Sequence, residues 1–317
     1  KKNKVKLLRG NLIRMIGLKR GTVKLIAHQD EWLKEAEKTI KELKYLLSNT
    51  AVDIQHIGST AISSIHAKPI IDIMAAVRSL EKVDNVAKDF KELDYEYLGE
   101  FGIKGRRYLR KGGDERTHQI HIFQMDDWNN IGRHLAFCDY MRTHEKERKE
   151  YAKIKIELAR RFPYNIDGYC KGKENFVSSI EELALSHFDG AWDKMYIAAR
   201  KVQCERKISS LIEVGSISAA ILTSKGNIYV GVCIDTACSL GMCAERNAIA
   251  NMITNGESAI CRVIAIDQNG KPIPPCGACR EFMTQLMPDN YHDIEIILDY
   301  ENKKVVTLGD ITPDWWL

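Results

Sequence analysis

Two stretches in the second half of the chain decide its fold: CAERNAI at residues 243–249 and PCGACR at residues 275–280. They contain Cys243, Cys276 and Cys279, and each stretch has the pattern of a helix start. Three thiolates hold a zinc ion and leave its fourth position open for water, whereas a closed structural site usually has four protein ligands. Since no fourth Cys or His follows at matching spacing, the pattern predicts an open zinc site.

The residues next to these cysteines suit proton transfer at such a site. Glu245 lies two positions after Cys243, so it can approach the metal without binding it. From there it can take a proton from the zinc-activated water and pass it to a ring nitrogen and then to a leaving amine. Arg246 and Arg280 follow the two ligand stretches, and we expect them to offset the thiolate charge by hydrogen bonding to sulfur.

The combination Cys-x-Glu and Pro-Cys-x-x-Cys resembles the cytidine deaminase family over residues 195–317. The resemblance implies an α/β/α sandwich and hydrolytic deamination of cytidine, deoxycytidine or a cytosine-nucleoside analogue. It implies Zn²⁺ bound by Cys243, Cys276 and Cys279, with Glu245 as the acid and base. It also implies a homo-oligomer, a tetramer in the small all-cysteine members, in which a C-terminal aromatic ring of one subunit covers the base in another. The tail residues Trp315 and Trp316 resemble that ending, and interface packing is the alternative interpretation.

One segment departs from the pattern of the nucleoside deaminases. They carry an Asn-Val-Glu-Asn-like segment that holds the ribose, and residues 233–238 here read CIDTAC. Asp235 can accept a hydrogen bond from a ribose hydroxyl, but Cys233 cannot replace a bidentate amide. The other interpretation of Cys233 and Cys238 is small reduced residues of the core. A nucleoside analogue, such as a blasticidin-like antibiotic, is therefore an alternative substrate.

The first half carries a second pattern, HIGSTA at residues 56–61 followed by AKPIIDI at residues 67–73. A strand, a Gly-Ser turn and a carboxylate on the next strand can hold a phosphate and a metal together. Gly58 allows close approach of the backbone, Ser59 donates to a phosphate, Lys68 adds charge, and Asp72 would bind Mg²⁺.

These stretches resemble the GrpB family of nucleotidyltransferase-like proteins over residues 17–188, together with GRRY at 105–108, RTHQIHIF at 116–123 and FCDYMR at 137–142. The resemblance implies a nucleotidyltransferase-like α/β fold. Nucleotidyltransferases generally need two carboxylates flanking one residue, and the stretch DIM at 72–74 has one. Two interpretations follow. The domain binds a nucleotide or phosphate without transfer, through Ser59, Lys68, Arg106 and Arg107. Alternatively, a softer metal is held by Asp72 with His56, His118 and His121.

We predict two domains, residues 17–190 and 195–317, with the boundary near HFDG at 187–190, where glycine can end a helix. Apolar periodicity predicts helices and strands in both halves, and their alternation indicates sheets covered by helices. The predicted helices are 31–47, 139–162, 174–188, 195–211, 243–253 and 276–287. The predicted strands are 52–57, 70–77, 95–98, 107–110, 119–123, 217–222, 228–232, 262–266 and 294–298.

Composition sets limits on the function. The 317 residues are 44% hydrophobic and 28% charged, which excludes general disorder, and nothing approaches the roughly 20 apolar residues of a membrane span. The basic first 20 residues lack the apolar core of a secretory signal, so we expect a cytoplasmic protein, although a start at Lys1 suggests that some of the N-terminus is missing. An odd count of nine cysteines favours reduced thiols or a metal.

The net charge of +4 divides unevenly. Residues 195–317 hold 11 Lys and Arg against 14 Asp and Glu, and the first 194 residues carry a net charge of +7. The acidic second half argues against a base editor that acts on RNA, because polynucleotide binding needs a basic channel. The remaining alternative to a deaminase is a nucleotide-sensing module in which the zinc is structural and no deamination occurs.

Overall fold

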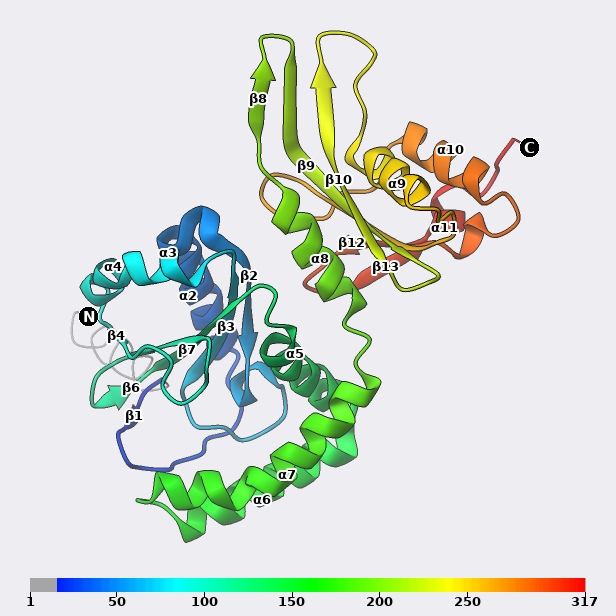
Figure 1. The fold of residues 1–317 in the computed structure, drawn as a ribbon. Coiled ribbons are helices and arrows are strands. Elements are labelled where there is room, and N and C mark those ends of the chain that lie inside the picture. Colours follow the sequence, from blue (N-terminus) through cyan, green and yellow to red (C-terminus); the bar gives the residue numbers. More distant parts are fainter. Residues whose placement is uncertain (1–15, 317) are drawn as a thin grey trace, which may run out of the picture. The chain divides into compact units, whose positions relative to one another are not determined.

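The computed structural model describes residues 16–316 and divides into two compact units, with the boundary between Asp189 and Gly190 (Figure 1). Both units are α/β, as predicted. Most of the basic N-terminal segment lies outside the described residues. Among the described residues, none of the helices combines the length and the apolar character that crossing a membrane requires.

The first unit is built on a five-stranded mixed sheet. Its strand order is β2-β3-β7-β5-β4, in which β3 and β7 are parallel and the other neighbours are antiparallel. The bounds are β2 Ala51–Ile57, β3 Ile71–Val77, β4 Tyr95–Tyr97, β5 Arg106–Lys111 and β7 His118–Gln124. A separate two-stranded sheet pairs β1 (Leu18–Lys19) with β6 (Glu115–Arg116).

Helices cover this sheet on both faces (Figure 1). On one face, Trp32, Ala36 and Leu43 of α2 pack against the odd-numbered residues of β3, which places the main core there. Because side chains alternate along a strand, Asp72 of β3 points to the opposite face. That face is covered by α5, which contacts β2 and β3 and packs with two further helices. The helices are α2 Glu31–Leu47, α3 Leu80–Asn85, α4 Ala87–Glu92, α5 Trp128–Thr143, α6 Glu145–Arg161 and α7 Ile166–His187, and η2 Ser48–Thr50 and η3 Ser59–Ala61 are short 3₁₀ turns.

The predicted single helix over 139–162 is wrong. His144 adopts an extended conformation (φ −107°, ψ 90°) that ends α5 and starts α6. Arg148 stabilises this break, because its Nη1 donates to the carbonyls of Met141 and Arg142 at 3.0 and 2.7 Å. The next helix begins at Ile166 rather than at 174, where the Asn165 side chain caps the helix by accepting from the Gly168 N–H at 2.9 Å.

The second unit is built on a six-stranded sheet with the order β10-β9-β11-β12-β13, and β8 pairs with β9 beyond this path. Only β11 and β12 are parallel neighbours. The predicted hairpin is confirmed: β9 and β10 are antiparallel, with Leu222 opposite Ile228. The bounds are β8 Arg206–Ser209, β9 Ile212–Thr223, β10 Ile228–Thr236, β11 Ile260–Ile266, β12 Glu295–Asp299 and β13 Lys304–Thr307.

Helices again cover both faces, so the predicted α/β/α sandwich is confirmed (Figure 1). Met195, Tyr196 and Ala199 of α8 pack on one face. Ile249 of α9 and Met283 of α10 pack on the other. The bounds are α8 Ala191–Val202, α9 Ala244–Thr254, α10 Gly277–Leu286 and α11 Leu308–Ile311, with the 3₁₀ turn η4 at Tyr291–Asp293.

The predicted helix over 195–211 is wrong beyond Val202. The Gln203 side chain donates to the carbonyls of Ser216 and Asp267, at 3.0 and 2.7 Å, and this directs the chain away from the helix axis. The residues that follow form the edge strand β8, in which every side chain is exposed. Pairing with the long strand β9 therefore outweighs the weak helical pattern of these residues.

Candidate functional site

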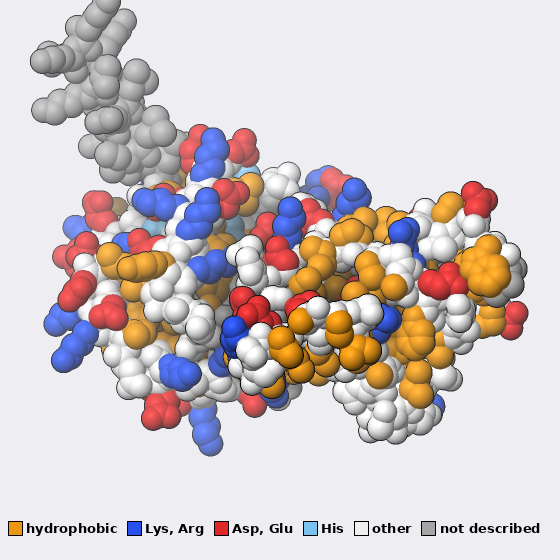
Figure 2. All heavy atoms as spheres, turned by 90° about the horizontal axis from the view of Figure 1, so that it is seen from above, with side chains coloured by type: hydrophobic (Ala, Val, Ile, Leu, Met, Phe, Trp, Pro, Cys, Tyr) orange, Lys and Arg blue, Asp and Glu red, His pale blue; other side chains and the backbone are white. Residues whose placement is uncertain are grey.

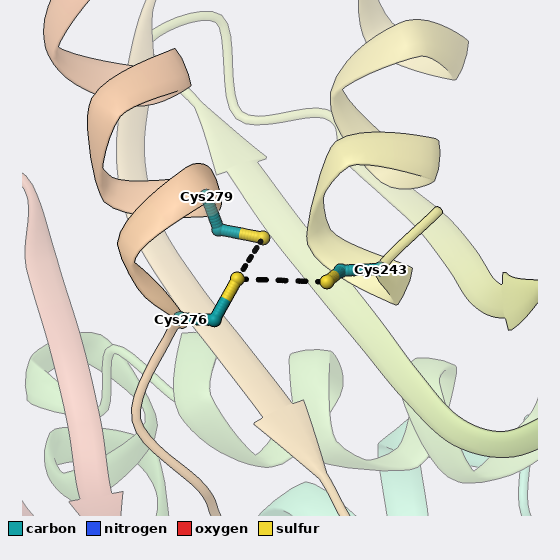
Figure 3. A group of neighbouring side chains, drawn as sticks. All are labelled: Cys243, Cys276 and Cys279. Carbon is teal, nitrogen blue, oxygen red and sulfur yellow. Dashed lines mark hydrogen bonds between the residues drawn. The ribbon is translucent and has the colours of Figure 1, made fainter. Parts of the chain in front are cut away.

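The three cysteines singled out by the sequence lie together in the second unit (Figure 3). Cys243 is the N-cap of α9, Cys276 is the N-cap of α10, and Cys279 lies in the first turn of α10. The Cys276 Sγ is 3.5 Å from each of the other two sulfurs, and all three sulfurs lie within 4.8 Å of one another. Sulfurs bound to one tetrahedral zinc ion at roughly 2.3 Å stand about 3.8 Å apart. The donor set and its spacing therefore fit zinc.

The pKa shifts of these three thiols also bear on metal binding. Burial raises the pKa of Cys243, and burial together with the Glu245 carboxylate raises the pKa of Cys279 above its usual range. At Cys276, burial acts in the same direction, but hydrogen bonds from backbone N–H groups at the start of α10 lower its pKa overall. Cys243 and Cys279 therefore resist becoming thiolates by themselves, and a divalent cation among the three sulfurs would reverse that preference.

Glu245 and Arg246 adjoin the sulfurs from the first turn of α9. Glu245 is only 4% exposed, burial raises its pKa, and its carboxylate accepts a hydrogen bond from the Cys279 thiol. Arg246 donates to the Cys243 sulfur, as predicted, and to the Gly241 carbonyl at 3.4 Å.

Arg280 does not make the sulfur contact that the sequence predicted. Its Nη1 donates to the Ile311 carbonyl at 2.6 Å, which connects α10 to α11. Of the two predicted arginines, only Arg246 therefore brings its positive charge to the sulfurs.

Gly231 of β10 sets the position of α9, a role that the motifs did not indicate. A Cβ at Gly231 would lie 2.3 Å from the Ala248 N and 2.5 Å from the Ala244 carbonyl oxygen. The start of α9, with Cys243 and Glu245, therefore lies directly against the backbone of the strand.

We expect Gly231→Ala to move α9 away from the sheet, to lower the free energy of unfolding by about 1–3 kcal/mol and to weaken zinc binding. Denaturant unfolding and a zinc competition titration measure the two effects. Gly226→Ala is the control, because Gly226 has φ +84° but open space around its Cβ position. That control should cost about 1 kcal/mol of backbone strain and leave zinc affinity unchanged. Equal zinc affinity in the Gly231 variant and the wild type would contradict this role.

The segment that departs from the nucleoside pattern is partly buried. Cys233 is 5% exposed, and its thiol donates to the Asp235 Oδ2 at 3.3 Å and contacts the Ser216 Oγ at 3.2 Å. Asp235 itself is exposed. Cys233 thus has the small buried role that the sequence offered as an alternative, but this interpretation is wrong for Cys238, which is exposed. Asp235 remains accessible to a ligand.

The two C-terminal tryptophans both contact α10 of their own unit. Trp315 and Trp316 donate from Nε1 to the two carboxylate oxygens of Glu281, at 3.1 and 3.2 Å. Trp315 also meets the Tyr291 ring edge-on at 5.7 Å, whereas Trp316 is 71% exposed. These contacts hold the tail near the helix that carries Cys276 and Cys279.

In the first unit, the structure brings together the predicted Gly-Ser turn and the predicted carboxylate. Gly58 has φ +71°, and a Cβ there would lie 2.7 Å from the Asp72 Oδ2. Ser59 begins the 3₁₀ turn η3 directly after it. Lys68 interacts electrostatically with Asp72.

The two predicted arginines are occupied elsewhere. Arg107 forms a bidentate ion pair with Asp84, at 2.6 and 2.8 Å, on the face of the sheet opposite Asp72. Arg106 shares the face of Asp72, but its guanidinium donates to the Phe101 carbonyl at 2.6 Å and to the Glu100 carbonyl at 3.2 Å. The structure therefore does not bring Arg107 to the Ser59 turn, because neighbouring strand residues point to opposite faces.

The alternative of a histidine-rich metal site is wrong. His118 lies three residues before His121 on β7, so the two rings point to opposite faces of the sheet. His118 interacts with Thr39 of α2, and His56 with Thr60. Within residues 16–316, the sulfur trio is the one group found with metal-binding geometry. Mg²⁺ at Asp72 is not supported either, because the charged groups acting on this carboxyl are the amines of three lysines.

Two family models match the chain. The model described as "GrpB protein" matches residues 22–183, and the model described as "Cytidine and deoxycytidylate deaminase zinc-binding region" matches residues 192–291. Among curated proteins, the UPF0157 protein YqkA of Bacillus subtilis is 40% identical over 162 residues, which cover 51% of this chain and 47% of YqkA.

Solved structures resemble each half. The crystal structure of the conserved protein GrpB from Enterococcus faecalis is 41% identical and covers 52% of this chain and 98% of its own, with a TM-score of 0.51. The crystal structure of cytidine deaminase from Mycobacterium leprae is 24% identical and covers 39% of this chain and 98% of its own, with a TM-score of 0.33. The second half of the chain contains a cytidine and deoxycytidylate deaminase zinc-binding region. Because the GrpB model and the GrpB structure both match the whole first half, the chain belongs to the GrpB family.

Proposed function

We propose that the second unit is a zinc-dependent hydrolytic deaminase of cytidine, deoxycytidine or a cytosine-nucleoside analogue. The observation that carries the proposal is the convergence of Cys243, Cys276 and Cys279 within 4.8 Å, with the buried Glu245 beside them. Three protein donors would leave room in the metal coordination for a reactant, which a closed structural site lacks. The match to the deaminase zinc-binding region supports the same reaction class.

In this proposal each residue has a defined task. The three cysteines would hold the metal, and zinc at such a site lowers the pKa of a water molecule so that it attacks a ring carbon at neutral pH. Glu245 would take one proton from that water and give it to the adjacent ring nitrogen. It would then carry the second proton, from the new hydroxyl on the ring carbon, to the exocyclic amine as ammonia leaves. Water and the cytosine ring are consumed, and a uracil ring and ammonia are released. Arg246 would limit the negative charge on the Cys243 sulfur.

The same proposal includes a homo-oligomer that forms through the second unit, a tetramer by family resemblance. Figure 2 shows hydrophobic side chains gathered over this unit, and large apolar residues are exposed there. They include Ile208, Leu211, Leu240, Ile253, Phe282 and Trp316. Exposed apolar groups of this size favour burial against another subunit.

The test is a substrate screen with the purified full chain. Nucleosides, nucleotides, free bases and blasticidin-type analogues are incubated with zinc-loaded protein, and ammonia release and the ultraviolet spectrum of the base are followed. We expect about one zinc per chain and turnover of at least one cytosine compound. Zinc-loaded protein that turns over nothing in the panel would contradict deamination and favour a structural zinc.

A further inference from the structure

Lys155 of α6 carries a buried amine that the fold does not explain. It is 2% exposed, and its Nζ has no hydrogen-bond partner among the described residues. Its Nζ lies over the face of the Tyr151 ring, 4.9 Å from the ring centroid. Burying an ammonium group in this way costs stability unless an anion compensates it. An unsatisfied buried group of this kind points to a missing partner.

Two further lysine amines meet at the same place. Lys173 of α7 donates to the Tyr151 hydroxyl, so Tyr151 contacts both Lys155 and Lys173. The Nζ atoms of Lys173 and Lys68 lie 5.6 and 5.4 Å from the centroid of one ring, Tyr169, which is 1% exposed. Two helices and the loop before β3 therefore direct three amines toward one region, the lysine cluster (Lys68, Lys155 and Lys173).

The charge in this region is unbalanced. Burial lowers the pKa of Lys155 and of Lys68, and in each case the neighbouring amines lower it further. Arg116 acts on Lys68 in the same direction, and its buried Nε has no hydrogen-bond partner among the described residues. Among residues 16–316, Asp72 is the carboxyl that acts electrostatically on all three amines, and burial raises its pKa to about 6.

A second acidic side chain acts near the lysine cluster, but it is paired elsewhere. Glu181 of α7 influences Lys173, but it forms an ion pair with Arg133 at 3.6 Å. In the part of the chain that the structure describes, none of the three lysines forms an ion pair with an acidic side chain. Three amines and a guanidinium against one carboxyl attract an anion with several charges.

We propose that the first unit binds a chain of two or three phosphates at the lysine cluster, with Lys155 and Lys173 reaching it from the helices and Lys68 from the loop. Lysine ammonium groups serve phosphate as compact point charges with freely oriented donors. The Gly58-Ser59 turn adjoins Asp72 and provides a close backbone approach on the same side. This site is independent of the zinc centre, and it does not use Arg107, which is paired with Asp84.

The phosphate chain has two possible sources, free oligophosphate or a nucleotide, and the experiment separates them. Binding of inorganic triphosphate, ATP and citrate to the full chain is measured by calorimetry and by thermal unfolding at constant ionic strength. We expect triphosphate to bind and to raise one unfolding midpoint. Tenfold tighter binding of ATP would identify a nucleotide as the source, and equal binding would identify the phosphate chain alone. Citrate binding as tightly as triphosphate would overturn the assignment to phosphate.

Lys155→Met is the decisive variant, because methionine keeps the length of the side chain and removes the charge. We expect triphosphate affinity to fall at least tenfold, while the midpoint of the unliganded protein stays the same or rises. Lys153→Met, an exposed lysine two positions earlier on α6, is the control and should bind normally. Unchanged triphosphate binding in Lys155→Met would overturn the proposal. So would a lower unliganded midpoint with affinity retained, since that would make Lys155 structural.

Discussion

Replacing Glu245 by glutamine is expected to lower kcat for deamination by a factor of about 10²–10⁴ and to leave the zinc content at one per chain. Glutamine fills the same buried space as the glutamate, which is only 4% exposed. It cannot take up and return a proton, so the attack on the ring and the departure of the amine both slow. Steady-state kinetics on the best substrate of the screen, with metal analysis of the same sample, measure both quantities.

Glu205→Gln is the matched control for this change. Glu205 is an exposed glutamate of the same unit, outside the group of residues around the sulfurs. Its variant should keep wild-type kcat and zinc. If Glu245→Gln deaminates at the wild-type rate, the proton-transfer role of Glu245 is wrong, and the zinc site needs another base.

Replacing Cys243 by serine is expected to weaken zinc binding by more than about 100-fold, because loss of a supporting residue around a metal already costs about 10–100-fold. Cys243 is the N-cap residue of α9, and its sulfur lies 3.5 Å from that of Cys276. Without zinc, α9 and α10 lose the ion that would join their first turns, so the unfolding midpoint of the second unit should fall as well. Zinc content after dialysis, chelator competition and thermal unfolding report these effects.

Cys261→Ser separates loss of a ligand from loss of a thiol. Cys261 is a partly exposed cysteine of β11 and does not belong to the sulfur trio. This variant should retain zinc and activity. A Cys243→Ser protein that still held one zinc per chain at wild-type affinity would show that Cys243 is not a ligand.

Sequence patterns predicted the elements whose side chains repeat regularly. The apolar stripe of Trp32, Ala36 and Leu43 predicted α2 with its observed bounds, because this stripe faces the main core of the first unit. The hairpin of β9 and β10 was equally clear from its two apolar runs. The edge strand β8 and the break at His144 were missed. Their conformations depend on pairing with β9 and on the hydrogen bonds of Arg148, which are contacts beyond the reach of local periodicity.

The residue types in the sequence and their spacing were sufficient to identify the candidate zinc ligands and the acid beside them. The pattern consists of Cys243, Cys276 and Cys279, with Glu245 two positions after the first cysteine. Its short spacings and helix starts limit where the sulfurs can lie. Only the tertiary structure decided the surroundings of the lysine cluster. The sequence places Lys155 in a charged helix that looks solvated, but α7 approaches α6 so closely that a Cβ at Gly172 would lie 2.4 Å from Leu158 Cδ2. Burial and net charge arise where segments distant in the chain meet, because desolvation depends on every neighbour in space and not on the neighbours in sequence.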